Sequence, residues 1–223
     1  MTNAVHTKFS LQFWPWKLVV LSFLFFIFSF FLLKPSPQKR TDYLPPPEIV
    51  KYINAGLRVQ MADSFWLRAI QDFDYCTDVK TDQTCVGQSW LFQILNLTTE
   101  LDSYFLEAYY YGGLALAVII SDYPGATKIF DKGVAEFPTE WPLLYAAGYH
   151  ALFEEKNKVK AAKLYLAAAE NGAPAWVRVL AGRLAFEGGE KEYAAKILEQ
   201  MIATSQDSKL IDRLKQKLMQ VQK

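Results

Sequence analysis

Histidine and cysteine are scarce in this sequence: the 223 residues include only His6 and His150, and Cys76 and Cys85. Because zinc sites and nucleophilic triads depend on these residue types, histidine-based metal or triad chemistry is nearly excluded. The sequence also lacks a glycine-rich phosphate loop, a G-x-S-x-G nucleophile elbow and an H-E-x-x-H motif. We therefore expect no enzyme activity, no cofactor and no bound metal.

Acidic residues are absent from residues 1–40, which contain five basic residues and eight of the 16 phenylalanines. The first 40 residues therefore carry a charge of +5, and the remaining residues carry −4. A nucleic-acid-binding domain needs a basic face to neutralise phosphates, so the acidic remainder argues against that class of partner. Such asymmetry indicates that the two parts of the chain occupy different physical environments.

An apolar run extends from Phe13 to Leu33, interrupted only by a few residues such as Lys17 near its start. At the helical rise, a run of this length spans roughly 30 Å, the thickness of a bilayer core. Aromatic and basic residues at its two ends suit the membrane–water interface, where indoles and lysines settle. These predicted interface residues are Trp14, Trp16, Lys17 and Lys34. The pattern predicts a single transmembrane helix at 13–33 that contacts lipid, after an N-terminal tail at 1–12.

The apolar run is not followed by the small residues of a signal-peptidase site, since Leu33 precedes Lys34 and Pro35. We therefore predict an uncleaved signal-anchor in the inner (cytoplasmic) membrane. Basic residues flank both ends almost equally, so the positive-inside count alone does not fix the orientation. The short N-terminal tail and the cysteine argument below favour a periplasmic or other extracytoplasmic C-terminal domain. Residues 34–47 contain five prolines and predict an extended, semi-rigid linker.

Residues 48–223 show helical hydrophobic spacing that is broken by proline and glycine at regular intervals. Pro138 and Pro174 are 36 residues apart, and Gly112, Gly148 and Gly182 are separated by 36 and 34. After each glycine comes a second predicted helix, with a small residue followed four positions later by a large one. These pairs are Ala126 with Phe130, Ala162 with Leu166, and Ala194 with Leu198. The period predicts stacked antiparallel helix hairpins.

In the spacing of these small, large and proline residues, the chain resembles the tetratricopeptide-repeat family, specifically its membrane-anchored bacterial members. The segment Ala175–Gln206 follows the family most closely, and GEKEYAAKILEQMI at Gly189–Ile202 is similar to the second helix of a repeat. Ser103 stands where the family usually has proline. The resemblance implies an all-α fold: an α-solenoid of helix hairpins at about 53–101, 103–137, 139–173 and 175–206.

The two ends of the predicted repeat domain depart from this regular pattern. The first hairpin is predicted to contain a helix near Pro47–Phe73 and another near Gly87–Leu101, joined by a long loop at Asp74–Val86. At the other end, residues 208–221 place apolar residues on one helical face and basic residues on the other. We predict that this last helix caps the solenoid, as open repeat stacks require; a helix lying on the membrane surface is the alternative.

The first helices of the hairpins in such a superhelix line a concave face. Counting from the glycine of each unit, the predicted groove residues are Tyr109 or Tyr110, Tyr145, Tyr149, Trp176 and Arg183. Phe65, Trp66 and Arg68 extend this face toward the first hairpin. Aromatic residues and arginine dominate interface energetics, so the set predicts a groove for a partner peptide or helix. The alternative for any one ring is simple packing between helices.

The chaperone-binding branch of the family grips a C-terminal carboxylate with a basic clamp. Tyr145 and Tyr149 stand where the clamp lysine and asparagine are expected, so the resemblance does not extend to that activity.

Cys76 and Cys85 flank a polar loop, and a disulfide between them would tie the loop down and imply an oxidising compartment. Two unpaired thiols in a reducing compartment are the alternative.

Taken together, these patterns predict a membrane-tethered scaffold or assembly adaptor of a bacterial envelope complex, with a protein partner bound in the repeat groove. The rival interpretation is a structural subunit of a larger membrane machine, held mainly through its transmembrane helix. The sequence leaves the identity of the partner open, because a groove constrains the chemistry of its occupant and not its name.

Overall fold

The computed structural model describes residues 14–32, 46–72 and 86–222. The chain divides into two compact units, Met1–Asp42 and Tyr43–Lys223. Within the described residues every regular element is a helix, which confirms the all-α fold class. Cys76, Cys85 and Lys34 lie outside the described residues, so the disulfide and the C-terminal interface lysine stay predictions.

The described part of the first unit is one helix, α1, which runs from Trp14 to Leu32. The side chains of Trp16 and Lys17 are exposed, as are the apolar side chains that follow as far as Phe28. Trp14 belongs to the helix by its backbone. In the parts of the chain that the structure covers, no helix meets the combined length and hydropathy needed to cross a membrane.

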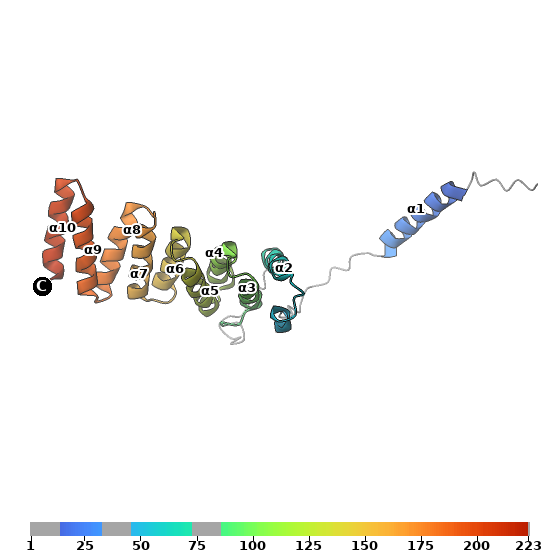
Figure 1. Cartoon of the computed structure of the whole chain (residues 1–223), viewed down its shortest axis with the longest axis horizontal. Coiled ribbons are helices and arrows are strands. Elements are labelled where there is room, and N and C mark those ends of the chain that lie inside the picture. The colour runs from blue at the N-terminus through green and yellow to red at the C-terminus, as the bar shows by residue number, and fades with distance from the viewer. Residues whose placement is uncertain (1–13, 33–45, 73–85, 223) are drawn as a thin grey trace, which may run out of the picture. The chain divides into compact units, whose positions relative to one another are not determined.

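The second unit is a row of short helices (Figure 1). In chain order they are η2 (Glu48–Lys51), α2 (Arg58–Gln71), α3 (Trp90–Leu101), α4 (Leu106–Ala115), η4 (Leu116–Ile120), α5 (Tyr123–Glu136), α6 (Trp141–Phe153), α7 (Lys158–Glu170), α8 (Ala175–Glu187), α9 (Lys191–Thr204) and α10 (Ser208–Val221). Each helix packs on the next in hairpin fashion, α4 with α5, α6 with α7 and α8 with α9. The result is a repeat-like stack in which α10 packs on α9 at the end.

The starts of α3 and α7 follow from N-capping side chains. Ser89 accepts a hydrogen bond from Phe92 N, and Asn157 accepts one from Lys160 N. Each cap satisfies one of the backbone N–H groups that a helix leaves unpaired at its start. At the start of α6, Pro142 occupies the first turn, where a missing N–H costs nothing.

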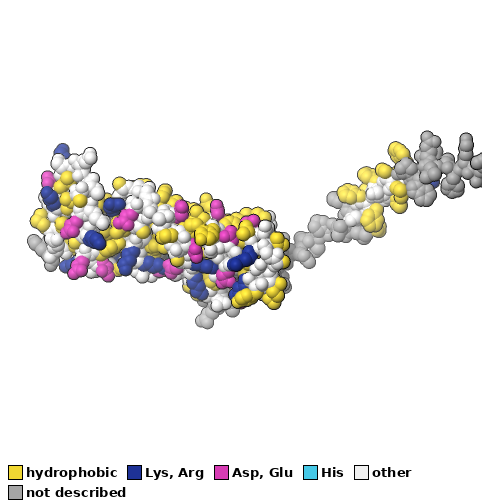
Figure 2. All heavy atoms as spheres, in the orientation of Figure 1, with side chains coloured by type: hydrophobic (Ala, Val, Ile, Leu, Met, Phe, Trp, Pro, Cys, Tyr) yellow, Lys and Arg dark blue, Asp and Glu magenta, His cyan; other side chains and the backbone are white. Residues whose placement is uncertain are grey.

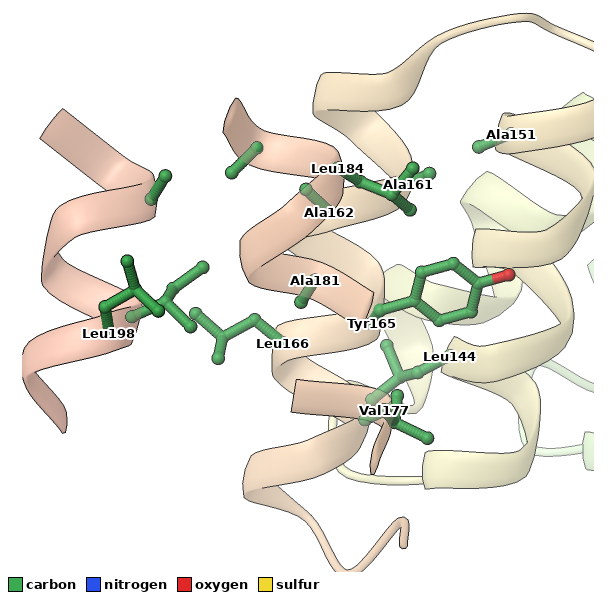
Figure 3. Packing of buried hydrophobic residues seen from close by; sticks show 14 of the residues in the cluster. Leu144, Ala151, Ala161, Ala162, Tyr165, Leu166, Val177, Ala181, Leu184 and Leu198 are labelled. Carbon is green, nitrogen blue, oxygen red and sulfur yellow. The ribbon is translucent and has the colours of Figure 1, made fainter. Parts of the chain in front are cut away.

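The core combines small and large residues on the second helix of each hairpin. The three small-and-large pairs predicted from the repeat period are all buried, namely Ala126 with Phe130, Ala162 with Leu166, and Ala194 with Leu198. Figure 3 shows the larger cluster, in which Tyr165 of α7 lies among residues of α6 and α8 such as Leu144 and Val177. Close packing of this kind requires alanine or glycine at the crossing points.

The prediction of one helix near Pro47–Phe73 is wrong. The structure has the short 3₁₀ helix η2 and then α2, which starts only at Arg58. Asn54 ends the first segment, since its side-chain Oδ1 accepts from Gly56 N and its Nδ2 donates to Lys51 O. Ala55 and Gly56 then both adopt positive φ, a conformation that no α-helix continues through.

The segment η4 is a π-helix over Leu116–Ile120, followed by Ser121 in the left-handed conformation at φ 62°. The turn closes with a bond from Asp122 N to Leu116 O at 2.9 Å. A π turn holds more residues than an α turn, so this segment takes up an additional residue within its hairpin. It also turns the side chains of Val118 and Ile119 outward.

Candidate functional site

Helix α6 carries a row of aromatic side chains that are wholly or partly exposed. Trp141, Tyr145, Tyr149 and Phe153 are spaced by four residues, so they lie along one face of the helix. Tyr149 is 49% exposed and Phe153 is also exposed, whereas Tyr145 is half-buried. A run of large rings that stays exposed on a well-packed helix is available to a partner.

The ring of Trp176 on α8 joins this row. It is 54% exposed, and its centroid lies 5.9 Å from that of Tyr145 in an edge-to-face arrangement. Tyr145 also contacts the buried Tyr165, at 5.2 Å between centroids, which anchors it to α7. Tyr149 and Phe153 pack on one another at 4.5 Å. We call these five residues the aromatic row: Trp141, Tyr145, Tyr149, Phe153 and Trp176.

The glycine contacts give the alignment between hairpins. A Cβ on Gly148 would meet Tyr165 of α7, and one on Gly182 would meet Ile197 of α9. In the preceding hairpin it is Gly113 that faces the second helix, because a Cβ added there would lie 2.7 Å from the ring of Phe130 on α5. A Cβ added at Gly112 would instead meet Leu95 of α3. Gly113 is therefore the counterpart of Gly148 and Gly182, and the spacing based on Gly112 was one residue out.

With this alignment, Leu114, Tyr149 and Arg183 occupy equivalent positions on α4, α6 and α8. Tyr110, Tyr145 and Val179 form a second equivalent set. Equivalent residues of a repeat stack line the same face. The face of the repeat stack that carries the aromatic row therefore continues onto α4 on one side and onto α8 on the other.

Tyr109 does not belong to this face, which corrects one of the two tyrosines offered by the sequence. Its side chain is 0% exposed and packs against Gly133 of α5. Burial raises the pKa of Tyr109 to about 12, as expected for a hydroxyl held away from water. Tyr110 is half-buried, and its ring packs edge-on against that of the exposed Tyr111 at 4.8 Å.

A first cleft of about 480 Å³ opens at the α4 end of the face. It lies between α2, α3, α4 and η4, and among the residues that the structure describes no charged one lines it. Its lining residues are Trp66, Ala69, Ile70, Leu91, Leu95, Tyr111, Gly112, Leu114, Ala115, Val118 and Ile119. Of the residues predicted to extend the groove, Trp66 lines this cleft and Phe65 packs in the core beside it. Arg68 instead lies over the ring of Trp90, at 5.2 Å from its centroid.

A second, smaller cleft of about 230 Å³ opens at the other end, between α8, α9 and α10. Its lining residues are Val179, Gly182, Arg183, Phe186, Leu198, Met201, Leu214, Lys217, Gln220 and Val221. Arg183 is exposed, and its Nε lies 3.4 Å from Oε1 of Glu187. The groove residue Arg183 thus stands at the rim of an apolar cleft and not in the aromatic row itself.

Buried polar groups hold the helices beneath this face in place. The carboxylate of Asp122 accepts from Gly87 N at 2.6 Å, from Ser89 Oγ at 2.6 Å and from Gly125 N at 3.0 Å, which ties the start of α3 to the start of α5. His150 is buried on α6, with Nε2 2.9 Å from Thr127 Oγ1. Burial lowers the pKa of His150 below its ordinary value of 6.5, and nearby Glu155 partly opposes that shift.

The sequence reasoning missed several residues of the face. Trp141 and Phe153 continue the four-residue spacing of Tyr145 and Tyr149, so the spacing alone was a sufficient signal. Val118 and Ile119 carried no comparable signal, because an α-helical reading does not place them outward together. Figure 2 shows that hydrophobic side chains gather in patches between charged ones on the face of the repeat unit that it draws.

Comparison of this chain with protein-family models, with curated proteins and with solved structures found no match. The geometry of the face that carries the aromatic row is therefore the basis for a proposed function.

Proposed function

We propose that this protein is an interaction scaffold or assembly adaptor that binds a peptide or helix of a partner protein along the aromatic row. The observation that carries the proposal is the row itself. Four rings at four-residue spacing on α6, joined by Trp176 on α8, stay partly exposed although they lie on a well-packed core. Large rigid rings bury much apolar area at small entropic cost, which is why they dominate binding surfaces.

The clefts at the two ends of the row support a macromolecular partner over a small ligand. Each cleft accepts apolar side chains, and exposed rings lie between the two clefts, so the whole forms an extended surface. A segment that laid apolar anchors in both clefts and crossed the row would bury a continuous strip. Such groove binding by spaced anchors is a common mode of peptide recognition.

The proposal includes a membrane tether at residues 13–33. Its support is the apolar run in the sequence, whose end residues Phe13 and Leu33 lie outside the described part of the chain. Tethering raises the effective concentration of the groove near membrane-bound partners. We propose that the protein lies in the inner membrane as part of a bacterial envelope complex, with the repeat unit on the extracytoplasmic side. In that compartment Cys76 and Cys85 would form a disulfide.

The tether and the disulfide have their own measurements. The full chain should stay with membranes during alkaline carbonate extraction, and a chain starting at residue 34 should be released. Maleimide labelling of denatured protein from intact cells should modify Cys76 and Cys85 only after reduction. Labelling without reductant would contradict the disulfide and remove one argument for the orientation.

The binding role is tested by affinity purification of the full-length protein in mild detergent. We expect the variant Tyr149→Ala/Phe153→Ala/Trp176→Ala to lose the co-purifying proteins while keeping the helical circular dichroism of the natural chain. Tyr104→Ala is the matched control, because Tyr104 is 78% exposed and lies outside the row. Equal recovery of partners by the triple variant would sink the proposal.

Deletion of residues 1–33 separates the adaptor from a structural subunit. An adaptor should still capture its partner through the repeat unit after the deletion. A subunit held by its membrane helix would lose every partner, and the triple aromatic variant would keep them.

A further inference from the structure

The second cleft combines an apolar interior with two positive side chains, a pairing that the first cleft lacks. Val179, Phe186, Met201 and Leu214 form apolar walls contributed by α8, α9 and α10. Arg183 and Lys217 line the same cleft from α8 and α10. An occupant must therefore bring an apolar group for the interior and negative charge for the rim.

The positive charge at this rim is only weakly neutralised by the protein itself. Glu187 approaches Arg183 at 3.4 Å, but its other oxygen accepts from Lys158 Nζ at 2.9 Å. The hydrogen bond from Lys158 also holds the pKa of Glu187 below its ordinary value. Among the residues that the structure describes, no carboxylate lies within ion-pair distance of Lys217. Exposed pairs of this kind contribute little, so the guanidinium and the ammonium remain available.

Helix α10 adds to the positive field, and most of its apolar face is already covered by the repeat stack. It carries Lys209, Arg213, Lys215 and Lys217 against the single acid Asp212. Most of its apolar face packs in the repeat stack, since Leu214 and Val221 are buried and Leu218 is half-buried, while Leu210 at its start and Met219 are exposed. A helix that lies on a membrane needs that face free. The basic surface therefore favours a protein segment over a lipid surface as its occupant.

We propose that the second cleft binds an acidic, amphipathic segment of the partner protein, with one apolar side chain seated in the cleft and flanking Asp or Glu side chains paired with Arg183 and Lys217. This inference rests on the proposed function, and it assigns the chemistry of the partner at one end of the groove. It also gives the groove a direction, because the first cleft is uncharged and suits a purely apolar stretch. The acidic part of the segment then lies over α8 and α10, and the apolar part lies toward α2 and η4.

The probe is a phage-displayed library of random peptides, selected on the full-length protein in detergent. Each peptide is fused to the coat protein at its C-terminus, so no free terminal carboxylate takes part. We expect the enriched peptides to carry Leu, Phe or Met close to two or more acidic residues. We expect binding of a synthetic enriched peptide to weaken severalfold between low and physiological salt, as screening of charge pairs requires.

The variant Arg183→Glu/Lys217→Glu tests the two rim charges directly. Both side chains are exposed, so the reversal leaves the core intact. We expect it to weaken the acidic peptide by at least about tenfold and to enrich basic peptides in a new selection. Lys209→Glu/Lys215→Glu is the matched control, because it changes the net charge of the protein by the same amount at two α10 residues outside the lining of the cleft. Equal losses in both variants would overturn the proposal, because general attraction would then explain them.

The remaining outcomes separate this inference from the proposed function. Enriched peptides that depend on Tyr149 and Phe153 but lack acidic residues would overturn the inference and leave the groove function standing. No enrichment above background on the natural protein would contradict both. A short-chain phosphatidylglycerol that binds through Arg183 and Lys217, where no acidic peptide does, would assign the cleft to lipid and overturn the inference.

Discussion

At the scale of single residues, the glycines at helix crossings decide how closely the hairpins pack. Gly113 of α4 lies against the ring of Phe130, which is itself 1% exposed and has no room to move. Gly182 of α8 occupies the equivalent position, but a Cβ added there would lie 3.3 Å from a methyl group of Ile197. The same residue type at equivalent sites therefore faces two different degrees of crowding.

We predict that Gly113→Ala destabilises the repeat unit by about 1–3 kcal/mol, because the added Cβ would lie 2.7 Å from the Phe130 ring. Gly182→Ala should be close to neutral, since the slight crowding at Ile197 is offset by the higher helix propensity of alanine. Urea denaturation followed by circular dichroism measures both. Equal destabilisation by the two variants would contradict the difference in crowding between the two sites.

His150 makes the stability of the repeat unit depend on pH. Burial lowers its pKa in the folded chain below 6.5. At a pH between the lowered pKa and 6.5, the unfolded state therefore binds a proton that the folded state does not bind. Stability should therefore be greatest above about pH 7 and fall as the pH drops through 6.5 toward the lowered pKa. Thermal melts at several pH values between about 7.5 and 5.5 measure this. The slope should flatten in His150→Gln, and an unchanged slope would assign the effect to other groups.

At the scale of elements, one buried carboxylate connects two hairpins. Asp122 caps α5 and also accepts hydrogen bonds from the residues that start α3, as Gly87 N and Ser89 Oγ both lie at 2.6 Å. Because Asp122 follows the π-helix and the left-handed Ser121, this anchor also fixes where η4 ends. The first cleft is lined by α3 and η4, so its shape depends on the same anchor.

We predict that Asp122→Ala costs about 3 kcal/mol of folding free energy, because it leaves several buried donors without a partner. Asp207→Ala removes an N-cap that is exposed to water, at the start of α10, and should cost only about 1 kcal/mol. Chemical denaturation of both variants gives the comparison. A cost for Asp122→Ala no greater than that for Asp207→Ala would show that the link between α3 and α5 is dispensable.

The sequence allowed the helical class and the buried faces of the second helices to be predicted, because periodic small and large residues mark the side of a helix that packs in the core. Ala162 with Leu166 is such a case. The exact alignment escaped prediction, since the π-helix adds a residue that a count from Gly112 cannot see. The break before α2 depends on Asn54 bonding its own backbone neighbours. Tyr109 and Tyr110 are adjacent and chemically identical, so only the packing of α4 against α5 separates the core residue from the surface one.

At the scale of the whole molecule, composition and structure point to a division of roles along the chain. The first 40 residues carry all the excess positive charge and half of the phenylalanines. The repeat unit, which is acidic in total, nevertheless concentrates basic side chains on α10 and exposed rings on α6. The proposed adaptor uses these features together: a tether from the first part, an aromatic row in the middle and a basic cleft at the end.

The central claim is that the aromatic row is the surface that meets the partner, and photo-crosslinking in intact cells measures that contact most directly. A benzophenone amino acid is placed at Tyr149 in one chain and at Tyr104 in another, two exposed tyrosines of which only the first belongs to the row. The account predicts a discrete protein adduct from position 149 after irradiation and none from position 104. An adduct from position 104 with none from position 149 would contradict it.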